Sequence, residues 1–295
     1  MAGLSQKTMT APVRVVLLCL SAAAFGALGN VVVRLMSAEI DALQIAFFRN
    51  LFGFLSALVL LPLAAAPGQS MLAGAFAIPG RMWLAAGLNL ISMSCFFTAV
   101  ALMPLGDLTA LSFAVPVWLT IGGALLLGES VRRNRWIATL GGIVGVLVIL
   151  RPGLGVLSLP ALLVLTGTVA FSLSSLTVKV ASRNQTALTI VFQLSLLMTV
   201  ISLGPALMVW RWPSLEGWLL GALLGTLATL GWYALTRGLN LADASATAPF
   251  DFARLPFTIV PAYLLFGEVP DAFALLGSAI IFGSALYASR QEMRR

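Results

Sequence analysis

Ten long apolar runs dominate the sequence, separated by charges, prolines and glycine clusters. A helix needs about 20 apolar residues to cross roughly 30 Å of hydrocarbon, and most of the runs have about this length. The runs are continuous rather than alternating with a period of two, which favours a helical bundle over a β-barrel. We therefore predict an all-α integral membrane protein with ten transmembrane helices, near residues 14–34, 43–63, 82–102, 107–127, 136–151, 157–178, 188–210, 217–239, 244–266 and 272–289.

The low charge content excludes an ordinary soluble protein. Only 9% of the 295 residues are charged and 60% are hydrophobic, with a mean hydropathy of +1.03, whereas about 25% of the residues of an average soluble protein are charged. The chain has no histidine, and Cys19 and Cys95 both lie inside apolar runs. These features disfavour a disulfide framework, a metal site and most hydrolase mechanisms. We expect no enzyme activity, no cofactor and no metal and, because the sequence contains no P-loop, no ATP-driven pumping.

The positive charges predict the orientation. Of the 17 lysines and arginines, 12 fall on the N-terminal side of the predicted topology, and two, Arg49 and Arg254, lie within spans. The opposite side has three, which are Arg34, Arg151 and Arg211. By the positive-inside rule, both termini of this multi-pass chain lie on the cytoplasmic side of the inner membrane. The first run has no clear cleavage site, so we predict a retained anchor.

The second half of the chain repeats the first. The aligned segments include residues 96–107 with 232–243, Ala24-Phe25 with Ala170-Phe171, and Phe113-Ala114 with Phe252-Ala253. Because each unit has five helices, an odd number, the second unit enters the membrane in the opposite sense. We predict two inverted five-helix repeats, residues 1–153 and 154–295. Secondary transporters often have this build, with a site between the halves; the alternative is a duplication that only stabilises the bundle.

Each predicted half also carries a motif at a matching place. A proline-bearing helix ends in Gly-Glu at residues 128–129 and again at 267–268, and Arg49 lies inside the second span. Together these features resemble the EamA-type members of the drug/metabolite transporter superfamily, including YddG-like amino acid exporters. The resemblance covers nearly the whole chain and implies a ten-helix fold of two inverted EamA repeats. It also implies the export of amino acids or the movement of other small metabolites. Leu194 stands where the second half would repeat Arg49, so any role of Arg49 is not duplicated.

Asp251 and Arg254 are the most distinctive charges, because the predicted ninth span places both near the middle of the bilayer. A charge there costs several kcal/mol, and a spacing of three puts both side chains on one helix face. They form either a self-neutralising pair that fixes packing or a substrate-binding pair that faces the central cavity. In the second interpretation Arg254 binds a carboxylate, and Asp251 binds an amine or carries a proton.

Other charges and prolines are candidates for gating or coupling. A proline within a span removes a backbone donor, so it is either a static kink or a hinge or substrate contact. A carboxylate at the end of a span either closes the helix or couples protons, and an arginine near the outer boundary either anchors the helix or contacts a gate. The candidates are Arg49, Pro116, Glu129, Pro256 and Glu268, with Pro249 and Pro261 as further prolines of the ninth span.

Among the polar and aromatic groups inside spans, we predict substrate contacts for Asn89, Trp232 and Tyr233. Most aromatic side chains of apolar helices serve packing, so these are selected from a larger set. A glycine at every fourth position of the eighth span predicts close helix packing rather than nucleotide binding, at Gly217, Gly221 and Gly225.

The leading hypothesis is a secondary transporter for a small amphipathic metabolite, with an amino acid leaving the cytoplasm as the first candidate. Substrate would bind between the halves near Arg254, and rocking of spans three and four against spans eight and nine would open one side at a time. An intramembrane lipid-linked transferase and a channel are the alternatives. The first would need a surface catalytic loop and the second a continuous polar pore face. We expect a small-molecule substrate and membrane lipid as partners, and no nucleic acid.

Overall fold

The computed structural model describes residues 5–64, 78–128, 133–150, 158–181, 187–241 and 252–293. All regular secondary structure in these ranges is helical, as predicted. The helices are α1 (Ser5–Met36), α2 (Ala42–Ala64), α3 (Gly80–Leu102), α4 (Leu105–Ser112), α5 (Val115–Leu127), α6 (Arg133–Leu150), α7 (Leu159–Ala181), α8 (Ala187–Met208), α9 (Leu215–Leu241), α11 (Arg254–Phe266) and α12 (Ala272–Met293).

Six helical segments are long and apolar enough to cross a membrane, and they coincide with predicted spans one to four, six and eight. Four shorter apolar helices fall in the other predicted spans, at Trp136–Leu150, Phe192–Met208, Arg254–Phe266 and Ala272–Ser284. The chain is thus an all-helical membrane protein, and the number of ten crossings stays a prediction.

Two predicted spans are not continuous helices. The fourth is broken at Phe113–Ala114, between α4 and α5, and in the ninth Phe252–Ala253 form a turn before α11. Prolines explain both breaks, because Pro116 and Pro256 have no N–H to bond to the carbonyl four residues earlier. The sequence predicts a kink or a hinge at these prolines, and the structure has a two-residue turn before each following helix.

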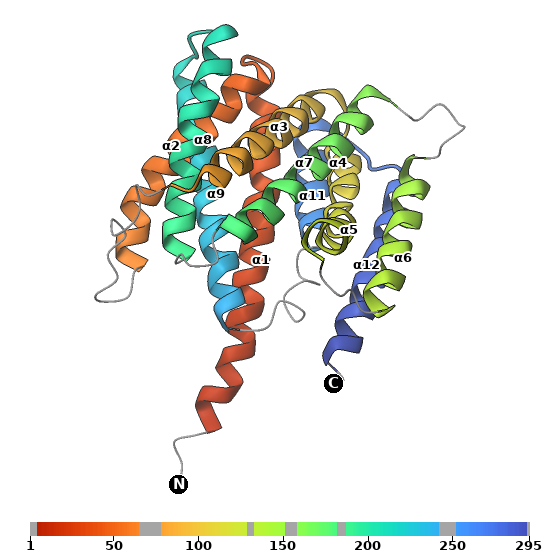
Figure 1. The fold of residues 1–295 in the computed structure, drawn as a ribbon. Coiled ribbons are helices and arrows are strands. Elements are labelled where there is room, and N and C mark those ends of the chain that lie inside the picture. Colours follow the sequence, from red (N-terminus) through yellow and green to blue (C-terminus); the bar gives the residue numbers. More distant parts are fainter. Residues whose placement is uncertain are drawn as a thin grey trace.

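The helix packing follows the predicted repeat. α1 packs against α9 and α11. In the same way α7, the counterpart of α1, packs against α3 and α5, which are the counterparts of α9 and α11. The pairs α2 with α8 and α6 with α12 also pack together, on opposite sides of the bundle (Figure 1). Each of these contacts therefore has a counterpart that the repeat relates to it.

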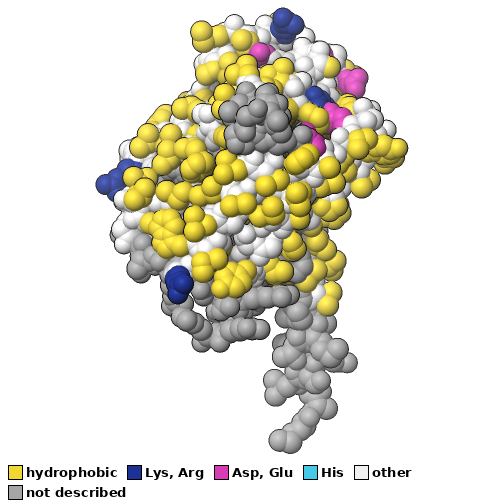
Figure 2. All heavy atoms as spheres, turned by 90° about the vertical axis from the view of Figure 1, so that its right-hand side faces the viewer, with side chains coloured by type: hydrophobic (Ala, Val, Ile, Leu, Met, Phe, Trp, Pro, Cys, Tyr) yellow, Lys and Arg dark blue, Asp and Glu magenta, His cyan; other side chains and the backbone are white. Residues whose placement is uncertain are grey.

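α1 begins and α12 ends at the same end of the bundle, which we call the terminal end (Figure 1). We call the opposite end, where α1 and α11 end, the far end. Hydrophobic side chains cover the middle of the face that contains α6 and α12, and the acidic side chains visible on this face lie near the far end (Figure 2). Such an apolar belt suits contact with lipid.

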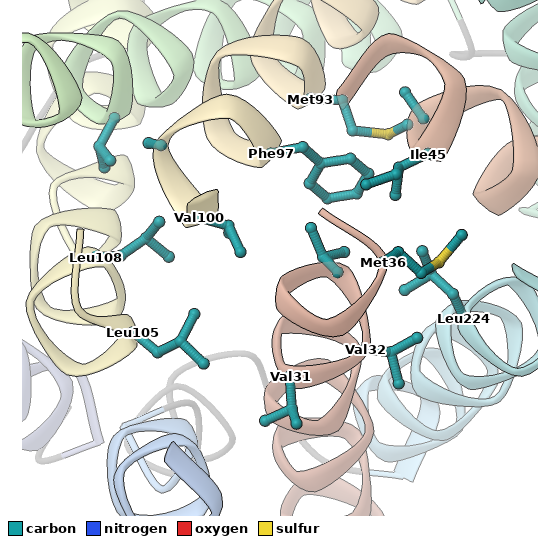
Figure 3. Close-up of a cluster of buried hydrophobic side chains, with 14 of the residues drawn as sticks. Val31, Val32, Met36, Ile45, Met93, Phe97, Val100, Leu105, Leu108 and Leu224 are labelled. Carbon is teal, nitrogen blue, oxygen red and sulfur yellow. The ribbon is translucent and has the colours of Figure 1, made fainter. Parts of the chain in front are cut away.

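Part of the buried core lies towards the far end of the bundle. Figure 3 shows side chains of α1, α2, α3, α4 and α9 that converge there, and all the labelled ones are buried. They are Val31, Val32, Met36, Ile45, Met93, Phe97, Val100, Leu105, Leu108 and Leu224. The far end is therefore closed by apolar packing between helices of both halves.

The glycine stripe of α9 brings this helix against α2. A Cβ on Gly225 would lie 2.5 Å from the backbone nitrogen of Gly53, and one on Gly221 would lie 3.2 Å from the Cβ of Phe48. Only glycine permits an approach this close, so the prediction of close packing is confirmed.

Candidate functional site

The two helix breaks meet inside the bundle. Phe113, in the break between α4 and α5, and Phe252, in the turn before α11, have ring centroids 4.5 Å apart. Since these phenylalanines correspond in the repeat, the contact joins equivalent points of the two halves. Interrupted helices of this kind expose backbone groups inside a membrane protein, and such groups are tolerated only against protein or a wet cavity.

The prolines of the two breaks occupy the first turns of the following helices. Pro116 is the second residue of α5 and Pro256 the third residue of α11, and both are exposed. In a first turn the missing N–H has no partner to lose, so these prolines start α5 and α11 rather than kink them. Pro261 lies inside α11, and Pro249 falls outside the described residues.

Arg254 is the first residue of α11, and its side chain lies against α1. Its Nε is 3.3 Å and its Cζ 3.7 Å from the position that a Cβ on Gly26 would take. The thirteen residues of α11 span about 20 Å, so Arg254 lies deep within the bundle. Asp251 falls outside the described residues, so the predicted pairing with Arg254 stays a prediction.

The contact between α5 and α7 at the first break, which is equivalent to the contact between α11 and α1, has different chemistry. In the predicted repeat Gly26 corresponds to Ser172 of α7, and Arg254 to Val115 of α5. The Ser172 hydroxyl donates to the carbonyl of Thr168 at 2.8 Å and lies 3.3 Å from that of Val115. Trp118 Nε1 donates to Thr168 Oγ1 at 3.1 Å. The first break is thus tied to α7 by hydrogen bonds, whereas the second presents a guanidinium to α1.

Arg49 of α2 turns towards α3. Its Nη1 donates to Asn50 Oδ1 and to Met93 Sδ, both at 3.3 Å. Asn50 in turn donates to Ser202 Oγ of α8 at 3.3 Å. Arg49 therefore contacts the interior of the bundle, which favours a gate or substrate contact over an anchor at the membrane surface. Its counterpart Leu194 packs against the hydrophobic core.

The remaining predicted substrate contacts lie on α3 and α9. Asn89 is half-buried and lies one helical turn from Met93 on the same face of α3. Trp232 is 50% exposed. Tyr233 is half-buried, and its hydroxyl accepts a 3.2 Å hydrogen bond from Arg237 Nε, one turn along α9. The role of these three residues as substrate contacts stays a prediction.

An ion pair joins the two halves at the far end. Glu268, directly after α11, pairs with Arg34 of α1 and also accepts a 2.8 Å hydrogen bond from the Leu105 N–H at the start of α4. Arg34 donates to the Met103 carbonyl at 2.8 Å. Gly267 makes this possible, since its φ of 66° ends α11 and turns the chain. These contacts support the closing role of Glu268.

The first half repeats the glycine cap. Gly128 ends α5 with a φ of 64°, and Glu129 falls outside the described residues. Sequence reasoning missed Arg34 as a partner of Glu268. The signal was available, because both residues end predicted spans on the same side of the membrane. It also missed the contact between Phe113 and Phe252, which their alignment in the repeat could have suggested.

Known proteins place this architecture in a family. Residues 13–151 and 158–290 match the EamA-like transporter family. The chain belongs to this family. The resemblance to EamA-type members of the drug/metabolite transporter superfamily is therefore confirmed, whereas the narrower likeness to YddG-like amino acid exporters stays a prediction.

Several curated relatives of this EamA-family chain are named as transporters of small metabolites. A riboflavin transporter of Vibrio cholerae is 35% identical over 194 residues, which are 65% of each chain. An S-adenosylmethionine uptake transporter of Rickettsia bellii is 25% identical over 90% of this chain and 89% of its own. A pseudopaline exporter of Pseudomonas aeruginosa is 26% identical over 89% of this chain and 91% of its own. The chain is thus a multi-pass membrane protein whose relatives are named as transporters rather than enzymes.

One solved structure shares the fold. It superposes with a TM-score of 0.65 over 95% of this chain and 96% of its own, at 16% sequence identity. At this identity the likeness concerns the fold alone.

Proposed function

We propose that the protein is a secondary transporter that moves a small amphipathic metabolite across the inner membrane by alternating access. The observation that carries this proposal is the meeting of the turn between α4 and α5 with the turn before α11, where the Phe113 and Phe252 rings are 4.5 Å apart. In transporters built from inverted repeats, broken helices at the interface of the repeats form the substrate site. Membership of the EamA-like family supports the same function.

In this proposal residues 1–153 and 154–295 are two inverted five-helix repeats that give ten crossings, with both termini in the cytoplasm. The terminal end then faces the cytoplasm and the far end the outside. The structure has a far end closed by the apolar core and by the Arg34–Glu268 pair. It therefore corresponds to a state closed towards the outside, and substrate release to the outside requires this pair to separate.

The proposed substrate site lies between the breaks and the terminal end. Arg254 supplies a guanidinium for a carboxylate, and Asn89, Trp232 and Tyr233 supply an amide and aromatic faces, with Asp251 as amine partner or proton carrier. Arg49, Glu129, Glu268, Pro116 and Pro256 take part in gating or coupling.

An amino acid exported from the cytoplasm is the first candidate substrate. The names of the relatives extend the panel to riboflavin and S-adenosylmethionine, of which the second is itself an amino acid derivative. The guanidinium of Arg254 fits the carboxylate that amino acids and S-adenosylmethionine share.

Uptake and counterflow in proteoliposomes test this function. The full chain is reconstituted and supplied with labelled amino acids, riboflavin and S-adenosylmethionine, with and without a pH gradient. We expect saturable uptake and accelerated exchange for at least one compound, because a carrier binds substrate on each side in turn. Flux that rises linearly with concentration and shows no counterflow would indicate a channel and contradict the proposal.

A further inference from the structure

Arg49 lies next to the apolar core that closes the far end, on the side of this core that faces the terminal end. On α2 it lies one helical turn nearer the terminal end than Ile45, and on α3 its partner Met93 lies one turn nearer that end than Phe97. Ile45 and Phe97 are both in the core that closes the far end (Figure 3). A molecule that entered from the terminal end would therefore meet Arg49 where the closed region begins.

The hydrogen-bonding capacity of Arg49 is largely unused. A guanidinium has five N–H donors, and within the described residues only Nη1 has partners, the amide oxygen of Asn50 and the sulfur of Met93. Both partners are neutral, both distances are 3.3 Å, and a thioether is a weak acceptor. Arg49 is half-buried, and Nε and Nη2 are not among the fully buried side-chain atoms that lack a hydrogen bond.

No carboxylate in the described part of the chain forms an ion pair with Arg49. Among the residues that the structure describes, the ion pair of Arg34 and Glu268 is the one pair within 4.0 Å. An arginine remains charged under all physiological conditions, and an uncompensated charge in the membrane interior costs several kcal/mol. Evolution keeps such a residue where water or a ligand balances the charge, which makes it a candidate functional residue by default.

The fold itself does not require an arginine at this position. Leu194 takes the corresponding place in the second half and packs against the hydrophobic core. Asn89, one turn further towards the terminal end on the face of α3 that carries Met93, makes no hydrogen bond within the described part of the chain. A guanidinium and an amide on two neighbouring helices thus both have donors to offer.

We propose that Arg49 forms an anion-binding subsite, in which its free N–H donors hold a carboxylate or phosphate of the transported molecule. The inference rests on the proposed function, and it adds a second cationic contact at a different depth from Arg254. The guanidinium matches the planar pair of oxygens of a carboxylate, which a lysine ammonium would not do equally well. The substrates would then be molecules that carry an acidic group.

Chemical labelling of the unmodified full chain tests the subsite without any transport measurement. Phenylglyoxal reacts with accessible guanidinium groups, and peptide mass spectrometry gives the labelling rate of each arginine. Benzoate is the probe, and benzamide, which has the same shape without the charge, is its control. We expect benzoate to slow the labelling of Arg49 roughly tenfold more than benzamide does, because a charge-assisted hydrogen bond contributes about 1.5 kcal/mol or more. Exposed Arg14 is the internal reference and should label equally with either compound.

Equal protection by the two compounds, or no labelling of Arg49 without them, would overturn the inference. Variants give a second test, since Arg49→Gln should lower the selective effect of benzoate on thermal unfolding to the part that Arg254 contributes, and Arg49→Lys should lower it less. Met93→Leu, which removes the sulfur acceptor but leaves the charge of Arg49, should retain the selective effect of benzoate fully. Protection without transport would refute only the proposed function, and transport without protection would refute only the subsite.

Discussion

Both α5 and α11 begin directly after a two-residue turn, but the two turns differ in chemistry. In the first half, α5 starts at Val115 beside Ser172 of α7, and in the second half α11 starts at Arg254 beside Gly26 of α1. Gly26 leaves space for the Arg254 guanidinium, whereas the Ser172 hydroxyl lies within hydrogen-bond distance of two backbone carbonyls. The two turns thus start equivalent helices, and the first residue of the helix is a charged arginine in α11 and an apolar valine in α5. We infer that the second break handles substrate and that the first supports it.

Removing the guanidinium of the second break should have the largest effect. Arg254→Ala should lower uptake by roughly 10- to 100-fold, because a hydrogen bond to a charged group contributes about 1.5 to 3 kcal/mol. Initial uptake rates in proteoliposomes measure this. Arg254→Lys is the matched variant and should retain part of the activity, since it keeps the charge but loses the planar fork.

An Arg254→Ala protein that is monodisperse and transports within twofold of the wild type would remove the functional asymmetry between the breaks. The charge of Arg254 would then serve packing alone.

The ends of the same two helices extend the comparison to the far end. Both α5 and α11 end in a glycine with positive φ, and Glu268 after α11 bridges to Arg34 and to the N–H of Leu105. Glu268→Gln should favour opening of the far end. Labelling of Leu108→Cys, a fully buried position, should then accelerate about tenfold for a loss of about 1.4 kcal/mol. The reagent is a membrane-impermeant maleimide, and Cys19 and Cys95 are replaced by serine.

Glu39→Gln is the control for this change. Glu39 is also a far-end carboxylate, but it accepts hydrogen bonds from Ser214 at the start of α9 and does not contact α11. It should leave the labelling rate of Leu108→Cys unchanged. If both variants accelerate labelling equally, the far end is held by its total charge rather than by the Arg34 pair.

Sequence reasoning predicted the elements whose signal is local. The apolar runs, the glycine stripe of α9 and the family resemblance all follow from patterns within a few turns of helix or within one repeat. The break at Phe113–Ala114 was missed because a proline in a span is compatible with a kink as well as with a new helix start. Arg34 and Glu268 are separated by 234 residues, and although both end predicted spans on the same side, the spans alone do not say which helix ends lie next to one another.

The site was predicted in part for the same reason. Arg254 and Arg49 stand out because charges in apolar runs are rare, and both do lie inside the bundle. Their surroundings depend on which helices pack together, so neither Gly26 nor Met93 could be identified as a neighbour from the sequence.

Giving α1 the residue that α7 has at the equivalent position tests the role of the small side chain. Gly26→Ser adds a Cβ 3.3 Å from Arg254 Nε and a hydroxyl that can accept from it. We expect the apparent KM to rise about fivefold at unchanged maximal rate, because one such hydrogen bond is worth about 1 kcal/mol and competes with the substrate. The control is Gly29→Ser on the same helix, where the added Cβ meets Leu224 Cδ1 at an ordinary 3.7 Å. An equal effect of both serines would point to helix packing instead.

The smallest effect is expected at the first break. Ser172 is 1% exposed, and Ser172→Ala removes its hydrogen bonds to Thr168 and Val115 while leaving the methyl-sized volume filled. Stability should fall by about 1 kcal/mol, which lowers the midpoint of thermal unfolding by about 2 to 4 °C. Uptake should stay within twofold. Ser175→Ala, which loses a bond only to Phe171 of its own helix, is the comparison and should cost less. A Ser172→Ala protein with normal stability and strongly reduced uptake would mean that the first break also contacts substrate. The inference that the second break alone handles substrate would then be wrong.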